Sequence, residues 1–264
     1  MRIQFESSTA CNAGCSFCPR IDMTRTMGMM SDELFRKIIK EGKEMGAKYY
    51  LPFLNGEPFL FPKIYDWIGY MEKEGVRVVL YTNAELIDVD RLLKYSNIRY
   101  INCSLNAATE ETHKKIMRFP NFERVNKNVE DLIKNAYFSV TVSMAVSAEN
   151  AHEEEMFRNK WGKRASVSRV FSWPSWSGNK GRALERGIRK IPCDHMLKNV
   201  IILWDGRVSL CCLDYDGKVI LGNLNNESLK DIIVNKLDPI RRRHLALDFD
   251  MPLCKSCNKN EVFG

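Results

Sequence analysis

Apolar residues follow two different spacings along the first 170 residues. In short segments they alternate with polar residues or form continuous runs, which is typical of strands. Between these segments they recur every three or four positions, as in Ile64, Trp67, Ile68 and Met71, which is typical of amphipathic helices. The spacings predict strands at residues 1–7, 49–54, 76–81, 100–105, 138–146 and 165–171. They predict helices at residues 31–45, 64–71, 88–95, 110–117, 121–136 and 151–161.

Strands that alternate with helices form parallel sheets joined by right-handed crossovers. Six such units are too few for a complete eight-stranded barrel. We therefore expect an α/β fold in which residues 1–171 form a partial (β/α)6 barrel of the TIM type. Residues 172–192, rich in Trp, Pro and Gly, predict a linker. Residues 193–264 predict a small second module, with a hairpin around Asp205-Gly206 and a short helix from Ser228. So small a module needs a metal to stabilise it.

The composition excludes several classes of protein. With 45% hydrophobic and 28% charged residues, the chain of 264 residues is not intrinsically disordered. It has no run of apolar residues of about 18 or more, as a membrane span requires, and no secretion signal at its start. We expect a cytoplasmic protein. The net charge of +7 is spread along the chain. Its one compact basic cluster, residues 241–244, is expected to be a solvated helix face, so a nucleic-acid partner is not expected.

The nine cysteines carry the strongest chemical signal. An odd number without a secretion signal argues against a disulfide framework. Soft thiolates in clusters select zinc or iron–sulfur groups. Three of them, Cys11, Cys15 and Cys18, lie in one segment directly after the first strand. Three thiolates are one short of a closed tetrahedral zinc site, so either a distant fourth ligand completes the site or one metal position stays open.

The segment from Cys11 to Pro19, with Phe17 before the third cysteine, resembles the cysteine motif of the radical S-adenosylmethionine (SAM) superfamily. The resemblance implies that the three thiolates hold a [4Fe–4S] cluster with one iron open to the amino and carboxylate groups of SAM. Reductive cleavage of SAM then releases a 5′-deoxyadenosyl radical, which takes a hydrogen atom from the substrate. In such enzymes the protein binds and orients the cofactor, which carries the chemistry.

Further segments resemble the same superfamily in the same order along the chain. Asn55-Gly56-Glu57-Pro58 is similar to its Gly-Gly-Glu-Pro segment, which meets the methionine ammonium, and Thr82-Asn83-Ala84 is similar to its Thr-Asn-Gly turn. Ser104 matches a serine that contacts the ribose, and Arg118 an arginine that pairs with the cofactor carboxylate. The SAM-binding residues implied are Phe17, Asn55, Gly56, Glu57, Asn83, Ser104 and Arg118. Strand alternation places Cys103 on the opposite side from Ser104, in the core.

The remaining cysteines resemble the SPASM/twitch auxiliary-cluster modules of this superfamily. The resemblance implies a second [4Fe–4S] cluster on four thiolates, those of Cys193, Cys211, Cys254 and Cys257. A zinc ribbon is the alternative for these four cysteines. Cys212 is left over, and strand alternation predicts that it points away from Cys211. It is a substitute ligand, an inert thiol or a hydrogen-atom donor to a substrate radical.

The resemblance to the amino-cyclitol dehydrogenases of this superfamily, as in the butirosin pathway, implies oxidation of a small polyol or sugar-like substrate. The auxiliary cluster is then the electron acceptor. An epimerase or peptide-modifying enzyme is the alternative, and a zinc-stabilised nucleic-acid-binding protein a remote one. Because the first strand starts at residue 1, we expect no peptide-recognition domain and favour a small-molecule over a peptide substrate. The implied electron donor is a reductase or a flavodoxin- or ferredoxin-type protein. Four polar residues are pocket candidates without an assigned role: Glu6, Arg169, His195 and Asp214.

Overall fold

The computed structural model describes residues 1–118, 121–169, 191–255 and 257. Its strands are β1 (Arg2–Phe5), β2 (Tyr49–Leu51), β3 (Arg77–Thr82), β4 (Ile98–Ser104), β5 (Ser139–Val146), β6 (Ala165–Arg169), β7 (Asn199–Ile202), β8 (Arg207–Ser209) and β9 (Ile220–Asn223). Its α-helices are α1 (Asp32–Glu44), α2 (Ile64–Lys73), α3 (Val89–Leu92), α4 (Glu110–Met117), α5 (Phe122–Asn135), α6 (Glu154–Trp161), α7 (Asp194–Lys198), α8 (Leu229–Ile232) and α9 (Asp238–Leu245).

Shorter helical turns complete the list of elements. The 3-10 turns are η1 (Pro19–Asp22), η2 (Pro58–Leu60), η3 (Ala151–Glu153) and η4 (Gly162–Arg164). A π-helical turn, η6 (Ile233–Leu237), joins α8 to α9. Local sequence explains where the longer helices begin. In α1, for example, the hydroxyl of Ser31 accepts a hydrogen bond from the backbone N–H of Leu34, and acidic residues fill the first turn.

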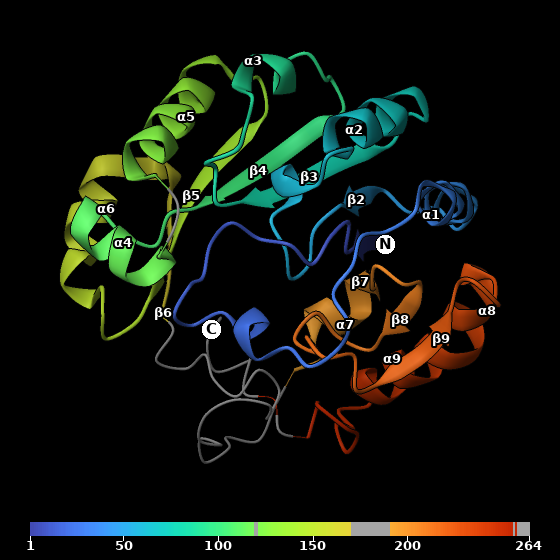
Figure 1. Cartoon of the computed structure of the whole chain (residues 1–264). Helices are drawn as coiled ribbons and strands as arrows, with labels where there is room; N and C mark the ends of the chain where they lie inside the picture. Colours follow the sequence, from blue (N-terminus) through green and yellow to red (C-terminus); the bar gives the residue numbers. More distant parts are fainter. Residues whose placement is uncertain (119–120, 170–190, 256, 258–264) are drawn as a thin grey trace.

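The described strands form one sheet in the order β6-β5-β4-β3-β2-β1-β7-β8-β9. Strands β1 to β6 are parallel and lie in chain order, and helices α2, α3 and α5 line the outer face of β3–β5 (Figure 1). The predicted partial barrel is therefore confirmed. The hairpin of β7 and β8 around Asp205-Gly206 is also as predicted, with Ile202 opposite Val208.

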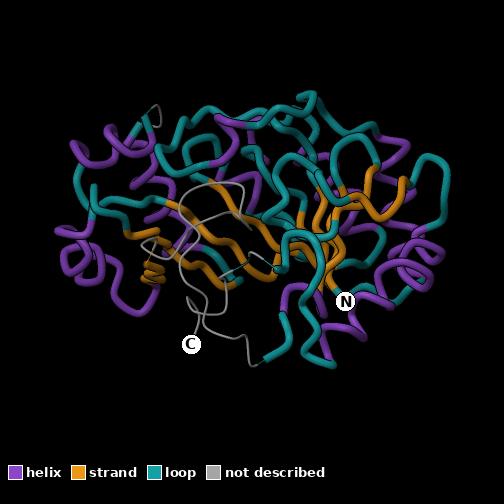
Figure 2. The backbone as a smooth tube through the Cα atoms, turned by 90° about the horizontal axis from the view of Figure 1, so that it is seen from below, coloured by secondary structure: helices purple, strands orange, loops and turns teal. Residues whose placement is uncertain are grey.

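The second module continues the sheet of the barrel. Strand β7 pairs in parallel with β1, with Phe5 opposite Ile202, and the hairpin therefore extends the barrel sheet. The sequence pattern did not reveal this pairing. A single core cluster contains residues of both parts, including Phe5, Phe35, Ile202 and Leu229. In the view from below the strands cross the middle of the molecule and the helices lie around its outside (Figure 2).

A long loop joins β1 to α1 and carries the three N-terminal cysteines. It leaves the end of β1, includes η1 and returns to its own first residues, where Ser8 and Met29 form an isolated antiparallel bridge. This loop, blue in Figure 1, lies beside the β7–β8 hairpin. The indole N–H of Trp204, in the hairpin, donates to the carbonyl of Thr26, in the loop, at 3.1 Å. Among the described residues, no helix is both long and apolar enough to cross a membrane.

Candidate functional site

The N-terminal cysteine loop is fixed to the end of α4. The backbone N–H groups of Gly14 and Ser16 donate to the carbonyls of Met117 and Ile116, both at 2.9 Å. The sulfur of Cys15 lies 3.4 Å from that of Met117. Phe17 is half-buried and packs against the small apolar cluster that Met117 shares with Ala13 and Ile116. Main-chain hydrogen bonds thus fix the position of the loop that carries the three cysteines.

Burial disfavours the thiolate form of Cys11 and Cys15 when no cation is bound. It raises the pKa of Cys11 to about 11 and, together with the neighbouring cysteines, that of Cys15 to about 12. A bound metal offsets this cost, because thiolate ligands lose their protons to the metal. Within the described ranges, no three His, Cys, Asp or Glu side chains are grouped as around a single metal ion. A [4Fe–4S] cluster distributes its thiolates over separate irons, and three half-buried thiols on one loop fit that donor set.

The segment after β2 packs directly on the cysteine loop. The backbone N–H of Glu57 donates to the carbonyl of Ala10 at 2.8 Å. A side chain at position 56 would place its Cβ 2.2 Å from the carbonyl oxygen of Ser8, so this approach requires Gly56. Asn55, one residue earlier, donates through Nδ2 to Glu6 at 3.2 Å.

Glu57 organises the ends of β2 and β3. Its buried carboxylate accepts hydrogen bonds from the hydroxyl of Thr82 (2.7 Å), the backbone N–H of Asn83 (2.8 Å) and the backbone N–H of Phe59 (3.1 Å). Burial raises the pKa of Glu57 to about 7, against these donors, which lower it. The carboxylate is therefore poised to respond to a nearby positive charge.

Asn83 links this region to the cysteine loop. Its Nδ2 donates to the side-chain oxygen of Asn12 at 2.8 Å, and Asn12 donates in turn to Glu85. Asn12 and Glu85 were not singled out by the sequence. Asn12 lies inside the cysteine motif and Glu85 lies next to the Thr-Asn-Ala turn. Their nearness to these motifs could have marked them as site residues.

Ser104 ends β4 and Arg118 ends α4. Ser104 belongs to a hydroxyl and amide group on one face of β4 and β5. In it, Nδ2 of Asn102 donates to the hydroxyls of Ser104 (3.2 Å) and Ser143 (2.8 Å). Cys103 is fully buried in the core, as predicted. Arg118 is exposed and ends α4 with a φ of +71°, directly after Met117, which contacts Cys15.

The C-terminal cysteines converge on one cavity. It is small, with about 20 Å³ of space for the centre of a water molecule, and it is partly open to solvent. Its lining includes all five cysteines of this region, namely Cys193, Cys211, Cys212, Cys254 and Cys257. They come from the start of α7, the turn after β8 and the turns after α9. Five soft donors around one cavity fit an iron–sulfur cluster with four thiolate ligands.

The position expected for Cys212 is wrong. Strand β8 ends at Ser209, so residues 211–213 form a turn in which strand alternation does not apply. Cys212 consequently lines the same cavity as Cys211, and its sulfur lies 3.7 Å from Nδ1 of His195. The fully buried His244 of α9 also lines the cavity.

The other pocket candidates have different surroundings. Asp214 is buried, and its carboxylate accepts from the hydroxyl of Ser209 and the backbone N–H groups of Lys218 and Val219, which shapes the turn after β8. Glu6 lies fully buried at the end of β1. The side chain of Arg169 lies outside the described residues.

The basic cluster of α9 is not merely solvated. Arg241 donates to the carbonyls of Met196 and Asn199, and Arg243 pairs with Asp248 at 2.7 Å. The bonds of Arg241 fix α9 against α7 and β7 beside the cavity, whereas Arg243 pairs with the chain just after α9 and stays partly exposed.

Family models decide the assignment. Residues 5–159 match the model of the radical SAM superfamily, and residues 193–258 match that of the SPASM iron–sulfur cluster-binding domain. The chain belongs to the radical SAM superfamily. Its members use SAM bound to a [4Fe–4S] cluster, and the SPASM domain adds auxiliary iron–sulfur binding.

Individual relatives are distant. An AdoMet-dependent heme synthase of Methanosarcina barkeri is 27% identical over 155 residues, which cover 57% of this chain and 44% of that protein. The matched part spans about half the length of the curated relatives. The crystal structure of BtrN in complex with AdoMet and 2-DOIA aligns at 16% identity with a TM-score of 0.69, covering 100% of this chain and 94% of that one. Streptococcus suis SuiB bound to precursor peptide SuiA aligns at 15% identity with a TM-score of 0.69, covering 96% and 65%. These solved structures share the fold.

Proposed function

We propose that Cys11, Cys15 and Cys18 hold the SAM-binding [4Fe–4S] cluster of this enzyme and leave one iron open to SAM. The three thiols share one half-buried loop whose backbone is fixed by α4, which supports the assignment. Three protein ligands leave one iron of a four-iron cluster without one. When bound together, the cluster and SAM supply a 5′-deoxyadenosyl radical that removes a hydrogen atom from the substrate.

The chain's own groups orient the cofactor in this proposal. Glu57 accepts from the methionine ammonium, whose charge lowers the carboxyl pKa from its raised value. Arg118, an exposed residue that directly follows Met117 at the end of α4, pairs with the cofactor carboxylate. Ser104 contacts the ribose. Asn55, Gly56, Asn83 and Phe17 shape the site around these contacts through the bonds and packing described above.

The auxiliary site takes its four thiolates from Cys193, Cys211, Cys254 and Cys257. The convergence of these cysteines on one cavity is the observation that carries the proposal. Four thiolates saturate a [4Fe–4S] cluster, so no iron remains open for the substrate. A saturated cluster supplies an electron acceptor, and we therefore assign this enzyme an oxidation, with residues 1–171 as catalytic barrel and residues 193–264 as auxiliary domain.

The substrate of this oxidation is a small polyol or sugar-like molecule. Hydroxyl and amide groups of Asn102, Ser104 and Ser143 lie together on β4 and β5, near the carboxyl ends of the strands. Phe53 and Tyr81 stack at 4.7 Å between ring centroids, and Tyr81 is 39% exposed. Polar groups beside an exposed aromatic ring suit a ring with several hydroxyls. BtrN, whose structure contains 2-DOIA, matches this chain over nearly its whole length.

Anaerobic turnover with a panel of cyclitols, amino-cyclitols and hexoses tests the proposal. The reconstituted protein is incubated with SAM and a strong reductant, and 5′-deoxyadenosine and oxidised product are quantified. We expect one 5′-deoxyadenosine per oxidised product, with no solvent deuterium in the product. The Cys18→Ala variant, which lacks one proposed ligand, is the matched blank. Zinc in place of iron in the wild-type protein would refute the proposal.

A radical epimerase or peptide modifier is the second candidate, because Cys212 lines the auxiliary cavity. The relative SuiB was solved with a precursor peptide, which also favours testing peptides. In this version the Cys212 thiol donates a hydrogen atom to the substrate radical, and the remaining thiyl radical regains an electron from the added reductant and a proton from solvent. Solvent deuterium then appears in a product of unchanged oxidation state, and Cys212→Ala abolishes its incorporation. Full turnover of Cys212→Ala would eliminate this candidate.

A further inference from the structure

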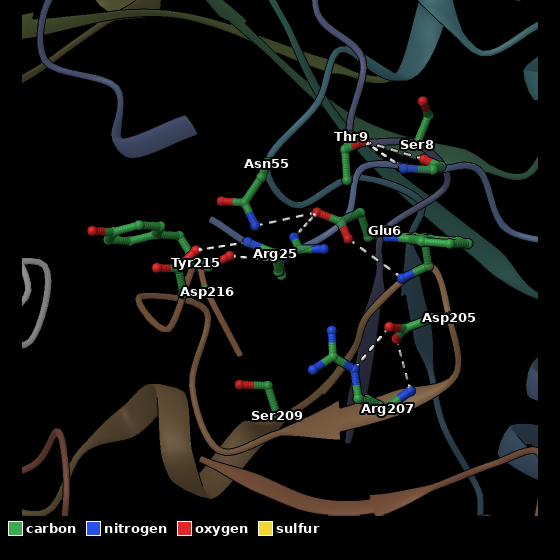
Figure 3. A network of polar contacts seen from close by, with 12 residues as sticks. Glu6, Ser8, Thr9, Arg25, Asn55, Asp205, Arg207, Ser209, Tyr215 and Asp216 are labelled. Carbon is green, nitrogen blue, oxygen red and sulfur yellow. Dashed lines mark hydrogen bonds and ion pairs between the residues drawn. The ribbon is translucent and has the colours of Figure 1, made fainter. Parts of the chain in front are cut away.

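Glu6, at the end of β1, joins three parts of the molecule (Figure 3). Its Oε1 accepts hydrogen bonds from Nη2 of Arg25 at 2.6 Å and from Nδ2 of Asn55 at 3.2 Å. Its Oε2 accepts from the backbone N–H of Trp204 at 3.4 Å. Arg25 lies on the cysteine loop, Asn55 precedes Gly56 in the proposed SAM-binding segment, and Trp204 lies in the hairpin of the SPASM domain. One carboxylate thus contacts all three.

Arg25 ties the cysteine loop to the SPASM domain. Its side chain is only 4% exposed, and its Nε donates to the carbonyl of Tyr215 at 2.7 Å. The next residue of that domain, Asp216, accepts from the backbone N–H of Thr24 at 2.7 Å and from its hydroxyl at 3.2 Å. The position of this part of the loop is therefore set by polar contacts with the SPASM domain (Figure 3).

Directly beyond these contacts the loop pairs with its own first residues, just after β1. The backbone N–H of Thr9 donates to the carbonyl of Gly28 at 3.0 Å, and that of Gly28 donates to the Thr9 hydroxyl at 2.9 Å. A Cβ at position 28 would lie 2.6 Å from the ring of Trp204, so the indole packs closely on the loop. Residues 11–18 are therefore held at two places. One is the end of α4, and the other is the segment from Thr24 to Gly28, which contacts the SPASM domain.

A buried ion pair is a costly way to join two parts of a protein. Its desolvation penalty can exceed its Coulombic gain, so apolar side chains of the same volume often give more stability. What a charged, hydrogen-bonded pair adds is directionality, because its groups must meet at fixed distances and angles. The pair of Glu6 and Arg25 is thus better explained by positioning than by stability.

We infer that Glu6 and Arg25 are positioning residues for the reaction. They fix the SPASM domain relative to both the cysteine loop and the Asn55–Glu57 segment, and so set the distance between the two clusters and the orientation of the SAM-binding segment. The inference rests on the proposed function, because it assumes that both cysteine groups hold clusters.

The experiment compares Glu6→Gln and Arg25→Lys with Asp205→Asn. The control residue forms a partly exposed ion pair with Arg207 at 2.7 Å in the same hairpin. Three quantities are measured on reconstituted protein: iron content, the dissociation constant of SAM, and the dipolar coupling between the reduced clusters in pulsed EPR. We expect the two junction variants to retain the iron of both clusters, to bind SAM about tenfold more weakly, and to show an altered inter-cluster coupling. Asp205→Asn should match the wild type in all three.

A merely structural role predicts a different result. In that case the melting temperature of the junction variants falls, while SAM affinity and inter-cluster coupling stay at wild-type values, and the inference is overturned. If a single variant does not fold, Glu6→Gln with Arg25→Gln replaces it, because the double variant leaves no unpaired buried charge, and the same two readouts decide. A wild-type protein without auxiliary iron would refute the proposed function instead. The SAM-affinity comparison still tests the positioning of Asn55 in that event.

Discussion

The two cysteine groups of this molecule are built in opposite ways. The N-terminal group lies within one loop, residues 11–18, and its spacing is written in consecutive sequence. The C-terminal group is assembled from α7, the turn after β8 and the chain after α9, so it exists only when these elements have folded together. A site within one loop suits a cluster that keeps one iron open to a cofactor. An assembled site suits a cluster that is enclosed and also holds its domain together.

The surroundings of the two groups differ accordingly. The local site borders the ends of β2 and β3 and the end of α4, where polar side chains are arranged for a ligand. The assembled site is bordered by Met196, Ile201, Leu210 and Leu253, which are largely apolar neighbours. Under the proposed function, the local site is the place for chemistry and the assembled site holds the electron acceptor.

Removal of a cysteine from the local site should have the largest effect. Cys18→Ala is expected to lower 5′-deoxyadenosine formation by on the order of a thousandfold or more, as for loss of a group central to a reaction, while auxiliary iron remains. Product analysis and iron content measure both effects. Cys103→Ala, in the core of the same barrel, should retain activity and iron. Equal losses in both variants would show that the loop thiols have no special role.

Removal of a cysteine from the assembled site should separate the formation of 5′-deoxyadenosine from the oxidation of the substrate. Cys254→Ala is expected to lose the auxiliary iron and to lower the stability of the SPASM domain, because metal binding there is coupled to folding. Formation of 5′-deoxyadenosine should continue without the matching oxidised product. The ratio of the two products measures this uncoupling. A ratio that stays at one would contradict the assignment of an electron-acceptor role.

Glu57 should make the stability of the metal-free protein depend on pH. Its pKa is raised from 4.5 to about 7, so the folded state keeps a proton that the unfolded chain has already lost. Its contribution is therefore fully present below pH 4.5 and is lost as the pH rises through 7, a decrease of about 3 kcal/mol. Urea unfolding of the wild type and of Glu57→Gln between pH 4.5 and 8 measures the difference. Parallel pH profiles would show that Glu57 is ionised in the folded protein throughout.

Gly28→Ala should disturb the junction between the local site and the SPASM domain. The new Cβ would lie 2.6 Å from the ring of Trp204, and such overpacking is expected to cost about 1–3 kcal/mol of unfolding free energy. Gly69→Ala is the comparison: its Cβ would meet the ring of Tyr95 at 3.3 Å, which a small shift of that ring relieves, and alanine favours helix α2, so no comparable loss is expected. Thermal unfolding of both variants decides. Equal stability would mean that the indole yields without cost.

Cys212→Ser should have the smallest effect if the enzyme is a dehydrogenase. Four other cysteines line the auxiliary cavity, so cluster content and oxidised product are expected to stay within about a factor of two of the wild type, as for most substitutions of groups outside a reaction. Iron analysis and product yield measure this. Loss of the cluster would instead identify Cys212 as a ligand.

The sequence was most informative where the cause of structure is local. The apolar spacing of α2 and the capping of α1 by Ser31 are short-range features, and both helices lie where they were expected. The pairing of β7 with β1 was not foreseen, because it joins residues nearly 200 positions apart and leaves no periodic signal. The predicted orientation of the Cys212 side chain was wrong, because β8 ends at Ser209, three residues before the end of the predicted strand. Arg25 was missed, since nothing in its neighbourhood marks it as buried.

The central claim is that the local site leaves one iron open for SAM. EPR of the reduced Cys254→Ala/Cys257→Ala variant tests it most directly, because only the N-terminal cluster then contributes a signal. The account predicts that SAM shifts this spectrum and that methionine labelled with ¹⁵N at its amino group, once built into SAM, adds a hyperfine coupling. A spectrum that saturating SAM leaves unchanged would contradict the account.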